Sequence, residues 1–327
     1  MSALLTATEL TKHYPTKDGV PVKALNGVSF ELREGEILGV VGESGCGKST
    51  LGRTLMLLET PTAGSVVFDG TSIADLRGRR LKAIRQNIQM VFQDPFGSLN
   101  PRHTVGTIVG EPLVVHSRPN RRDRLVELLE LVGLPADAAR RFPHEFSGGQ
   151  RQRIAIARAL ALSPKVIIAD EAVSALDVSI QSQIINLLID LRQRLGLSMI
   201  FISHDLSVVR HVSDRIMVMY LGRAVEIAAT TDLFAKPQHP YTKALISAIP
   251  RIPGRDTMTV TSRIQLEGEV PDPKSPPEGC VFHPRCPIAE RRCRTEAPEL
   301  VAEANGAPWP CACHNAGDSL PAERAAP

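Results

Sequence analysis

A glycine-rich segment near the N-terminal end of the sequence ends in a lysine, a serine and a threonine. It fits the pattern G-x-x-x-x-G-K-S-T with the residues Gly42, Glu43, Ser44, Gly45, Cys46, Gly47, Lys48, Ser49 and Thr50. Glycines allow backbone N–H groups to turn toward phosphate oxygens where side chains would clash. Lys48 is expected to reach the β- and γ-phosphates, and the Ser49 hydroxyl to bind Mg²⁺. Because an apolar run precedes the segment and a helical run follows it, the pattern predicts a site for ATP and Mg²⁺ rather than a chance turn.

Two carboxylates end an apolar run farther along the chain. The run 166–170 reads VIIAD, and Glu171 follows its last residue, Asp170. A carboxylate at the C-terminal edge of a parallel strand faces the ligand crevice. Asp170 is therefore expected to hold Mg²⁺ through water, and Glu171 to orient and polarise the attacking water. Without the phosphate loop, a solvated acidic pair opening a loop would be the better interpretation of these residues.

Two further polar residues follow strand-like runs. Gln93 ends the run 89–93, and His204 follows the run 199–203. His204 is a candidate to contact the γ-phosphate, and Gln93 to touch Mg²⁺ or the water and to sense the γ-phosphate. A lone histidine is more often structural or exposed, so this assignment depends on the other motifs.

A second helix start with exposed N–H groups is predicted at Phe146–Gln150, before the helical run 150–162. Ser147 is suited to cap the helix, and Gly148 and Gly149 leave its first N–H groups open, as at an anion-binding helix end. Taken alone, an ordinary helix start would explain Ser147, Gly148, Gly149 and Gln150 equally well.

The segments between these motifs predict an α/β fold with a mostly parallel sheet, because strands alternate with helices. Strand-like runs occur at 28–32, 37–41, 89–93, 166–170, 199–203 and 215–222. Helical runs occur at 125–134, 150–162 and 180–195, the last with Ser179 as its expected N-cap. We predict a P-loop NTPase core, an N-terminal antiparallel β subdomain, an inserted helical subdomain at about 95–164, and a small cysteine-rich C-terminal extension.

The composition permits a large core and indicates no nucleic-acid partner. The chain has 327 residues, of which 43% are hydrophobic and only 4% aromatic, with a net charge of +3. Few aromatics disfavour a base-stacking surface. No apolar run approaches the roughly 20 residues that span a bilayer, and the N-terminus does not resemble a signal peptide. We therefore expect a protein kept in the cytoplasm.

Five of the six cysteines lie in the C-terminal extension, after a proline-rich stretch at 250–279: Cys280, Cys286, Cys293, Cys311 and Cys313. In a reducing compartment such a cluster more often binds metal than forms disulfides. The gaps do not match the short C-x-x-C pairs of structural zinc sites. Four thiolates suit Zn²⁺ or an iron–sulfur cluster, and free thiols packed in a small appendage are the alternative.

Together with Ser174–Asp177, the ordered motifs resemble the ATPase subunit of an ABC transporter over roughly residues 1–235. The resemblance implies that Ser147 to Gln150 serve the nucleotide held by an opposite ATPase subunit, that Asp177 lies at the dimer seam, and that Tyr14 stacks on adenine. Two positions depart from the usual pattern, since Ala172 replaces proline and Phe146 replaces leucine. Neither change removes a reacting group.

The segments 237–250, 279–293 and 312–314 resemble the oligopeptide/dipeptide importer branch, most closely its second, "F"-type ATPase. This resemblance divides the chain into an ATPase domain at 1–250 and an extension at 251–327. It implies a second, homologous ATPase, two membrane permeases, an extracytoplasmic peptide-binding protein, and a location on the cytoplasmic face of the inner membrane. It also implies a [4Fe–4S] cluster on Cys280, Cys286, Cys293 and Cys313, with Cys311 as the spare ligand and Zn²⁺ as the alternative metal.

Two other functions compete with transport. A soluble ABC ATPase acting on ribosomes or DNA usually carries two cassettes or a long coiled coil, whereas this chain has one phosphate loop and no heptad run. A regulatory module that only binds nucleotide would not need Glu171 and His204. Related importers carry nickel, glutathione or glycosides, so the sequence leaves the solute open.

Overall fold

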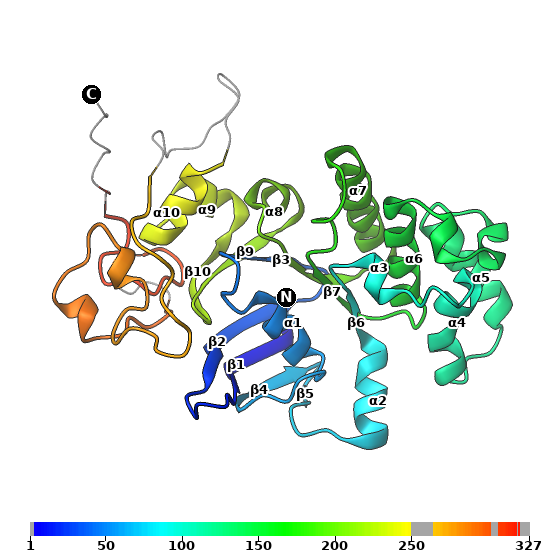
Figure 1. Ribbon diagram of the computed structural model, residues 1–327, viewed down its shortest axis with the longest axis horizontal. Helices are drawn as coiled ribbons and strands as arrows, with labels where there is room; N and C mark the ends of the chain where they lie inside the picture. The colour runs from blue at the N-terminus through cyan, green and yellow to red at the C-terminus, as the bar shows by residue number, and fades with distance from the viewer. Residues whose placement is uncertain (1–2, 250–263, 302–306, 319, 321–327) are drawn as a thin grey trace. The chain divides into compact units, whose positions relative to one another are not determined.

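The structure is a computed structural model that describes residues 3–249, 264–301, 307–318 and 320 (Figure 1). The proline-rich stretch is described only from residue 264 onward. The chain forms two compact units: one contains 1–4, 32–37 and 69–202, and the other contains 5–31, 38–68 and 203–327. We refer to the first as the helical unit and to the second as the loop unit.

The loop unit contains two sets of paired strands. Its strands are β1 (Ala3–Tyr14), β2 (Val22–Arg33), β3 (Ile37–Val41), β4 (Ala63–Phe68), β9 (Arg215–Tyr220) and β10 (Arg223–Ala229). β1 runs antiparallel to β4, with Leu5 opposite Phe68, as predicted for the N-terminal part. β3 runs parallel to β9, and β9 antiparallel to β10. All of β3 is buried, which explains its continuous apolar sequence.

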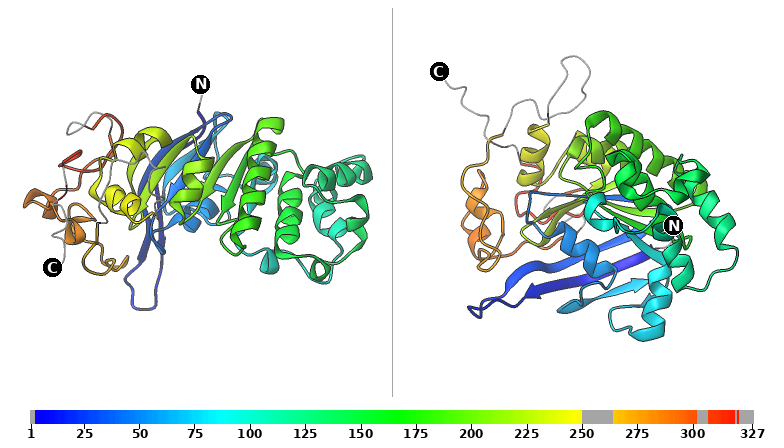
Figure 2. Two further views of the ribbon diagram at one scale, coloured as in Figure 1. Left: turned by 90° about the horizontal axis from the view of Figure 1, so that it is seen from above. Right: turned by 45° about the vertical axis from the view of Figure 1, so that its right-hand side comes forward.

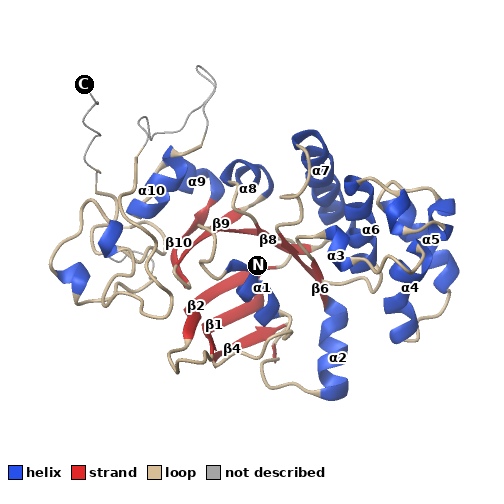
Figure 3. Cartoon of the chain, in the orientation of Figure 1, coloured by secondary structure: helices blue, strands red, loops and turns tan. Residues whose placement is uncertain are grey.

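Short helices and a long irregular segment complete the loop unit. The helices are α1 (Lys48–Leu55), α8 (Leu206–Val212), α9 (Thr230–Ala235) and α10 (Pro240–Ser247). Residues 264–301 form loops with two short helical turns, His283–Arg285 and Arg292–Arg294 (Figure 3). A segment with so little regular structure needs other contacts to hold its shape.

Three parallel strands support the helical unit: β6 (Ile88–Val91), β7 (Val166–Asp170) and β8 (Ser198–Ile202). β7 lies between the other two, with Val91 opposite Ala169 and Asp170 opposite Ile202. Every residue of β7 and β8 is buried, as expected for central strands of a parallel sheet. These strands confirm the parallel pairing predicted from the sequence.

Helices dominate the segment between β6 and β7. They are α3 (Pro95–Ser98), α4 (Val105–Val115), α5 (Arg121–Leu131) and α6 (Gly148–Leu160), with 3₁₀ turns at Ala136–Arg140 and Pro143–Glu145. α4, α5 and α6 pack against one another, as two further views show (Figure 2). Two smaller elements precede β6, namely β5 (Thr71–Ser72) and α2 (Gly78–Asn87).

Two predicted helix ends were wrong. The helix α7 (Val178–Leu195) begins after Asp177, whose backbone is extended, so Ser179 lies inside the helix and is not its N-cap. The predicted helix 125–134 ends at Leu131, because Gly133 takes a left-handed conformation with φ 73°.

In the part of the chain that the structure describes, no helix has the length and apolar character needed to cross a membrane.

Candidate nucleotide site

The phosphate loop connects β3 to α1 in the loop unit, and two of its glycines are required by space. A Cβ at Gly42 would lie 2.2 Å from the Met219 carbonyl oxygen, and one at Gly47 would lie 2.2 Å from the Ala24 carbonyl oxygen. Both residues also have positive φ values, 153° and 101°, which side chains disfavour. The backbone therefore reaches this shape only with glycine at both positions.

Lys48, the first residue of α1, folds back over the loop. Its side chain is buried, and Nζ donates hydrogen bonds to the carbonyl oxygens of Gly42 at 2.7 Å and Glu43 at 2.9 Å. A buried ammonium needs such acceptors. The lysine is thus held at the centre of the loop, where it can exchange carbonyl oxygens for phosphate oxygens.

His204 belongs to the same unit as the phosphate loop. The N–H of Ser203, the residue before it, donates to the Val40 carbonyl at 3.1 Å. Val40 lies two residues before Gly42, so the chain carries the exposed His204 side chain beside the strand end where the loop begins. The fold therefore places His204 near the start of the phosphate loop, although His204 and Gly42 are far apart in the sequence.

In the helical unit, the predicted residues at the strand ends meet. Gln93 Nε2 donates to Glu171 Oε2 at 2.9 Å, and the Glu171 N–H donates to the Ile202 carbonyl at 2.9 Å. Asp170, the residue before Glu171, is buried. Glu171 has φ 46°, an uncommon conformation for a residue with a side chain. Such strain persists only where surrounding contacts fix it, and it concentrates at functional sites.

The turn after Glu171 contains Ala172, which is buried and replaces the proline usual at its position. The N–H and the hydroxyl of Ser174 both donate to the Glu171 carbonyl, at 3.1 and 3.0 Å. These bonds close the turn after Glu171. The turn therefore has hydrogen bonds that restrain its shape without a proline.

Ser147 caps α6 in a reciprocal arrangement. The Gln150 N–H donates to Ser147 Oγ at 3.3 Å, while the Ser147 N–H donates to Gln150 Oε1 at 3.0 Å. Such a capping box fixes a helix start. A Cβ at Gly149 would lie 2.5 Å from Ile180 Cγ2 of α7, so glycine permits close packing there. Phe146 is buried, and the Cζ atom of Arg141 lies 4.3 Å from its ring centre. Phenylalanine in place of the usual leucine therefore changes the packing at this position.

Asp177 and Tyr14, whose roles are implied by the resemblance, lie at the ends of elements. Asp177 is exposed at the start of α7 and makes no side-chain capping bond to that helix. Tyr14 ends β1; its hydroxyl hydrogen-bonds to Glu59, and the Lys12 ammonium lies 5.1 Å from its ring centre.

Glu43 of the phosphate loop pairs with an arginine that no sequence motif indicates. The Glu43 carboxylate accepts two hydrogen bonds from the Arg285 guanidinium, at 2.7 and 3.2 Å, and the Glu43 N–H donates to the Tyr241 hydroxyl at 2.9 Å. Arg285 and Glu43 are 242 positions apart. Sequence patterns could not reveal this pair because the two residues belong to different segments with no spacing rule between them.

A buried carboxylate fastens the extension to β10. Glu226 is fully buried and accepts hydrogen bonds from the backbone N–H groups of Gln238 and His239, at 2.8 and 2.9 Å, and from Trp309 Nε1 at 2.8 Å. Burial raises its pKa. These donors compensate the loss of water around the buried carboxylate, so Glu226 connects the residues just before α10 to the extension.

Four cysteines of the extension line one small pocket: Cys280, Cys286, Cys293 and Cys313. Burial raises the pKa of Cys286 to about 11 and that of Cys313 to about 12, so both thiols are protonated at neutral pH. Cys311 does not line this pocket. Its backbone bridges Glu226 and Val301, and its side chain is fully buried.

The chemistry of the four thiols suits a metal cluster, but their present arrangement is tight. The pocket holds about 10 Å³, roughly the space of one water molecule. Among the residues with described positions, no group of three or more His, Cys, Asp or Glu side chains is arranged to hold a metal ion. A bound cluster would therefore require the thiols to move apart.

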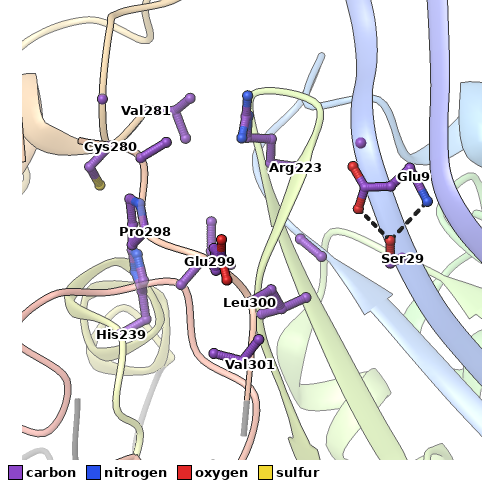
Figure 4. A pocket seen from close by; sticks show the side chains of 16 residues that line it. Glu9, Ser29, Arg223, His239, Cys280, Val281, Pro298, Glu299, Leu300 and Val301 are labelled. Atoms are coloured by element: carbon purple, nitrogen blue, oxygen red, sulfur yellow. Dashed lines mark hydrogen bonds between the residues drawn. The ribbon is translucent and has the colours of Figure 1, made fainter. Parts of the chain in front are cut away.

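A larger cavity of about 510 Å³ lies between the extension, β10 and the first strands of the loop unit (Figure 4). Arg223, Glu299 and Cys280 are among its lining residues, and on its opposite wall Ser29 Oγ donates to Glu9 at 2.8 Å. No residue of the phosphate loop lines it. The cavity is thus separate from the nucleotide-binding residues.

Two protein families match this chain. Residues 25–174 match the family described as ABC transporter, and residues 225–293 match the one described as oligopeptide/dipeptide transporter, C-terminal region. Among solved structures, a dimeric ATP-binding cassette in a post-hydrolysis state bound to ADP and Pi is 34% identical, with a TM-score of 0.63. It covers 69% of this chain and 98% of its own.

Similar proteins cover nearly the whole chain. A probable peptide ABC transporter ATP-binding protein of Sinorhizobium fredii is 56% identical over 95% of this chain and 90% of its own length. The oligopeptide transport ATP-binding protein AppF of Bacillus subtilis is 53% identical over 92% and 94%, respectively. The dipeptide transport ATP-binding protein DppF of Haemophilus influenzae is 51% identical over 93% and 94%. This protein therefore belongs to the family of ABC transporter ATP-binding proteins, which hydrolyse ATP.

Proposed function

We propose that this protein supplies the ATP-driven step in the import of dipeptides or oligopeptides. The observation that carries this proposal is the presence, in one chain, of an ABC ATPase region and of the oligopeptide/dipeptide transporter C-terminal region. The relatives named for peptide, oligopeptide and dipeptide transport support it over both regions. We place the boundary between ATPase domain and extension near residue 250.

In this proposal the two sets of strand-end residues divide the chemistry. The phosphate-loop N–H groups and Lys48 hold the β- and γ-phosphates, while Ser49 and Asp170 offer oxygen ligands for Mg²⁺, directly and through water. The ion would neutralise phosphate charge. Glu171 orients and polarises the attacking water, and Gln93, which hydrogen-bonds to it, senses the γ-phosphate. His204 contacts the same phosphate.

A second ATPase subunit would complete the site. Ser147, Gly148, Gly149 and Gln150 present an exposed helix start, which we assign to the nucleotide of the partner, with Asp177 at the seam and Tyr14 stacked on adenine. The solved dimer of a similar cassette supports such an arrangement. ATP then favours the closed pair, and hydrolysis removes the γ-phosphate that bridges the subunits.

The remaining partners follow from transport itself. In the described part of the chain no helix suits a membrane crossing, so we propose that two permease subunits form the pathway and that an extracytoplasmic binding protein delivers the peptide. The partner ATPase is expected to be a homologous second chain. This subunit would lie against the cytoplasmic face of the inner membrane.

The transport proposal is tested by uptake in the organism that makes the protein. Deleting its gene should remove most of the accumulation of radiolabelled dipeptides and short oligopeptides, since ATP hydrolysis by this subunit drives the proposed transport. A plasmid with the unmodified chain should restore uptake, and the Glu171→Gln variant should not. Unchanged peptide uptake combined with loss of nickel or glutathione uptake would contradict the peptide assignment.

We also propose that Cys280, Cys286, Cys293 and Cys313 hold a [4Fe–4S] cluster. Support comes from their shared pocket, which Cys311 does not line, and from their softness as ligands. When bound, such a cluster would cross-link an extension that has little regular structure of its own. Raised thiol pKa values mean that binding must release protons.

The cluster assignment predicts different outcomes for neighbouring cysteines. Anaerobically purified protein should contain iron and inorganic sulfide, with broad visible absorbance. Cys286→Ser should remove most of this absorbance, whereas Cys311→Ser should leave it nearly intact. Protein that contains zinc in place of iron would favour the alternative metal, and protein with neither would contradict the proposal.

A further inference from the structure

The phosphate loop carries a negative charge where a triphosphate is expected to bind. Glu43 is the second residue of the loop, and its side chain is about 29% exposed. A carboxylate close to phosphate groups repels them unless a cation neutralises it. The structure provides that cation from the C-terminal extension, because Arg285 contacts both carboxylate oxygens of Glu43 at 2.7 and 3.2 Å.

Contacts other than the one to Glu43 also hold the Arg285 side chain. Only 8% of its side chain is exposed, its Nη1 lies 3.4 Å from the Tyr220 hydroxyl, and its guanidinium lies 5.9 Å from the Tyr220 ring centre. A paired fork of this kind is geometrically specific, and a lysine could not reproduce it.

An aromatic cluster joins the extension to the loop at the same point. Phe282 of the extension packs edge-on against Tyr220, with ring centres 5.2 Å apart, and lies 5.4 Å from Tyr241. The hydroxyl of Tyr241 accepts the Glu43 N–H. Both the backbone and the side chain of Glu43 are therefore held by residues outside the phosphate-loop motif.

We propose that Arg285 is a positioning residue for nucleotide binding: by neutralising Glu43 and holding it away from the phosphates, it makes the C-terminal extension set the affinity of the phosphate loop for ATP. The contact joins side chains of one chain, Arg285 and Glu43, and needs no second subunit. It also does not depend on which solute the transporter carries. The extension thereby acquires a direct role at the nucleotide.

The test is an equilibrium titration of the purified full-length chain with a fluorescent ATP analogue and Mg²⁺. Arg285→Ala should raise the dissociation constant about tenfold, because it exposes the phosphates to an unpaired carboxylate. Arg285→Lys, which keeps the charge but loses the fork, should raise it about threefold. Arg294→Ala changes an exposed arginine of the same extension and serves as the matched control, with no change expected.

The decisive variant is Arg285→Ala combined with Glu43→Gln. If Arg285 acts by neutralising Glu43, removing the negative charge should return the dissociation constant to within about threefold of the unmodified protein. A role in folding alone would not be rescued by a second change in the phosphate loop. Unchanged affinity in Arg285→Ala and Arg285→Lys, or a loss that Glu43→Gln does not recover, would overturn the proposal.

Discussion

Glu171→Gln is expected to lower the rate of ATP hydrolysis by about 10³-fold while ATP still binds, which is the size typical of losing a group that handles the proton of the attacking water. Glutamine keeps the shape and still hydrogen-bonds to Gln93, but it cannot accept a proton. Phosphate release by the assembled transporter measures turnover, and nucleotide titration of the same sample measures binding.

The structure supplies a matched control for this variant. Glu127 lies in the same unit, is more exposed, and pairs with Arg124 at 2.7 Å, so Glu127→Gln should hydrolyse ATP at the normal rate. ATP bound to the Glu171→Gln protein should also keep the two ATPase subunits associated, and Ser147→Arg in this background should separate them. Normal hydrolysis by Glu171→Gln would show that another residue activates the water.

Lys48→Ala is expected to weaken ATP binding about 100-fold, equivalent to roughly 3 kcal/mol, because two charge-assisted hydrogen bonds to phosphate oxygens are lost. The free loop loses its two internal bonds to the carbonyl oxygens of Gly42 and Glu43 as well. Isothermal titration with MgATP measures the loss directly, and peptide uptake should fall with it.

Lys236→Ala is the corresponding control. Lys236 is exposed and follows α9 in the same unit, so its removal should change neither ATP affinity nor the melting temperature beyond the small effect usual for surface positions. If Lys48→Ala bound MgATP as tightly as the unmodified chain, the assignment of the phosphate loop would be wrong.

The positions of the proposed site residues depend on strand ends. The phosphate loop follows β3, Gln93 follows β6, and His204 follows β8, while Asp170 ends β7 and Glu171 comes directly after it. In each case a mostly apolar strand leads to a polar residue at its carboxyl end, where functional groups of parallel sheets gather.

Local features of the site were determined by the sequence itself. The glycines of the phosphate loop, the capping box at Ser147 and the apolar strands before each motif depend on backbone preferences and on neighbours within a few residues. Such short-range determinants can be recognised as patterns. They established the fold class and proposed the candidate site residues, whereas they misplaced element ends such as the start of α7, where local signals compete.

Tertiary structure alone decided the contacts between distant segments. It joined Gln93 to Glu171 and Arg285 to Glu43, and it placed Cys313 at the pocket of the other three cysteines while Cys311 joined a bridge to β10. No spacing rule connects such residues, because their proximity results from the packing of whole elements. The sequence therefore specified the reacting groups, and the fold specified which charges surround them.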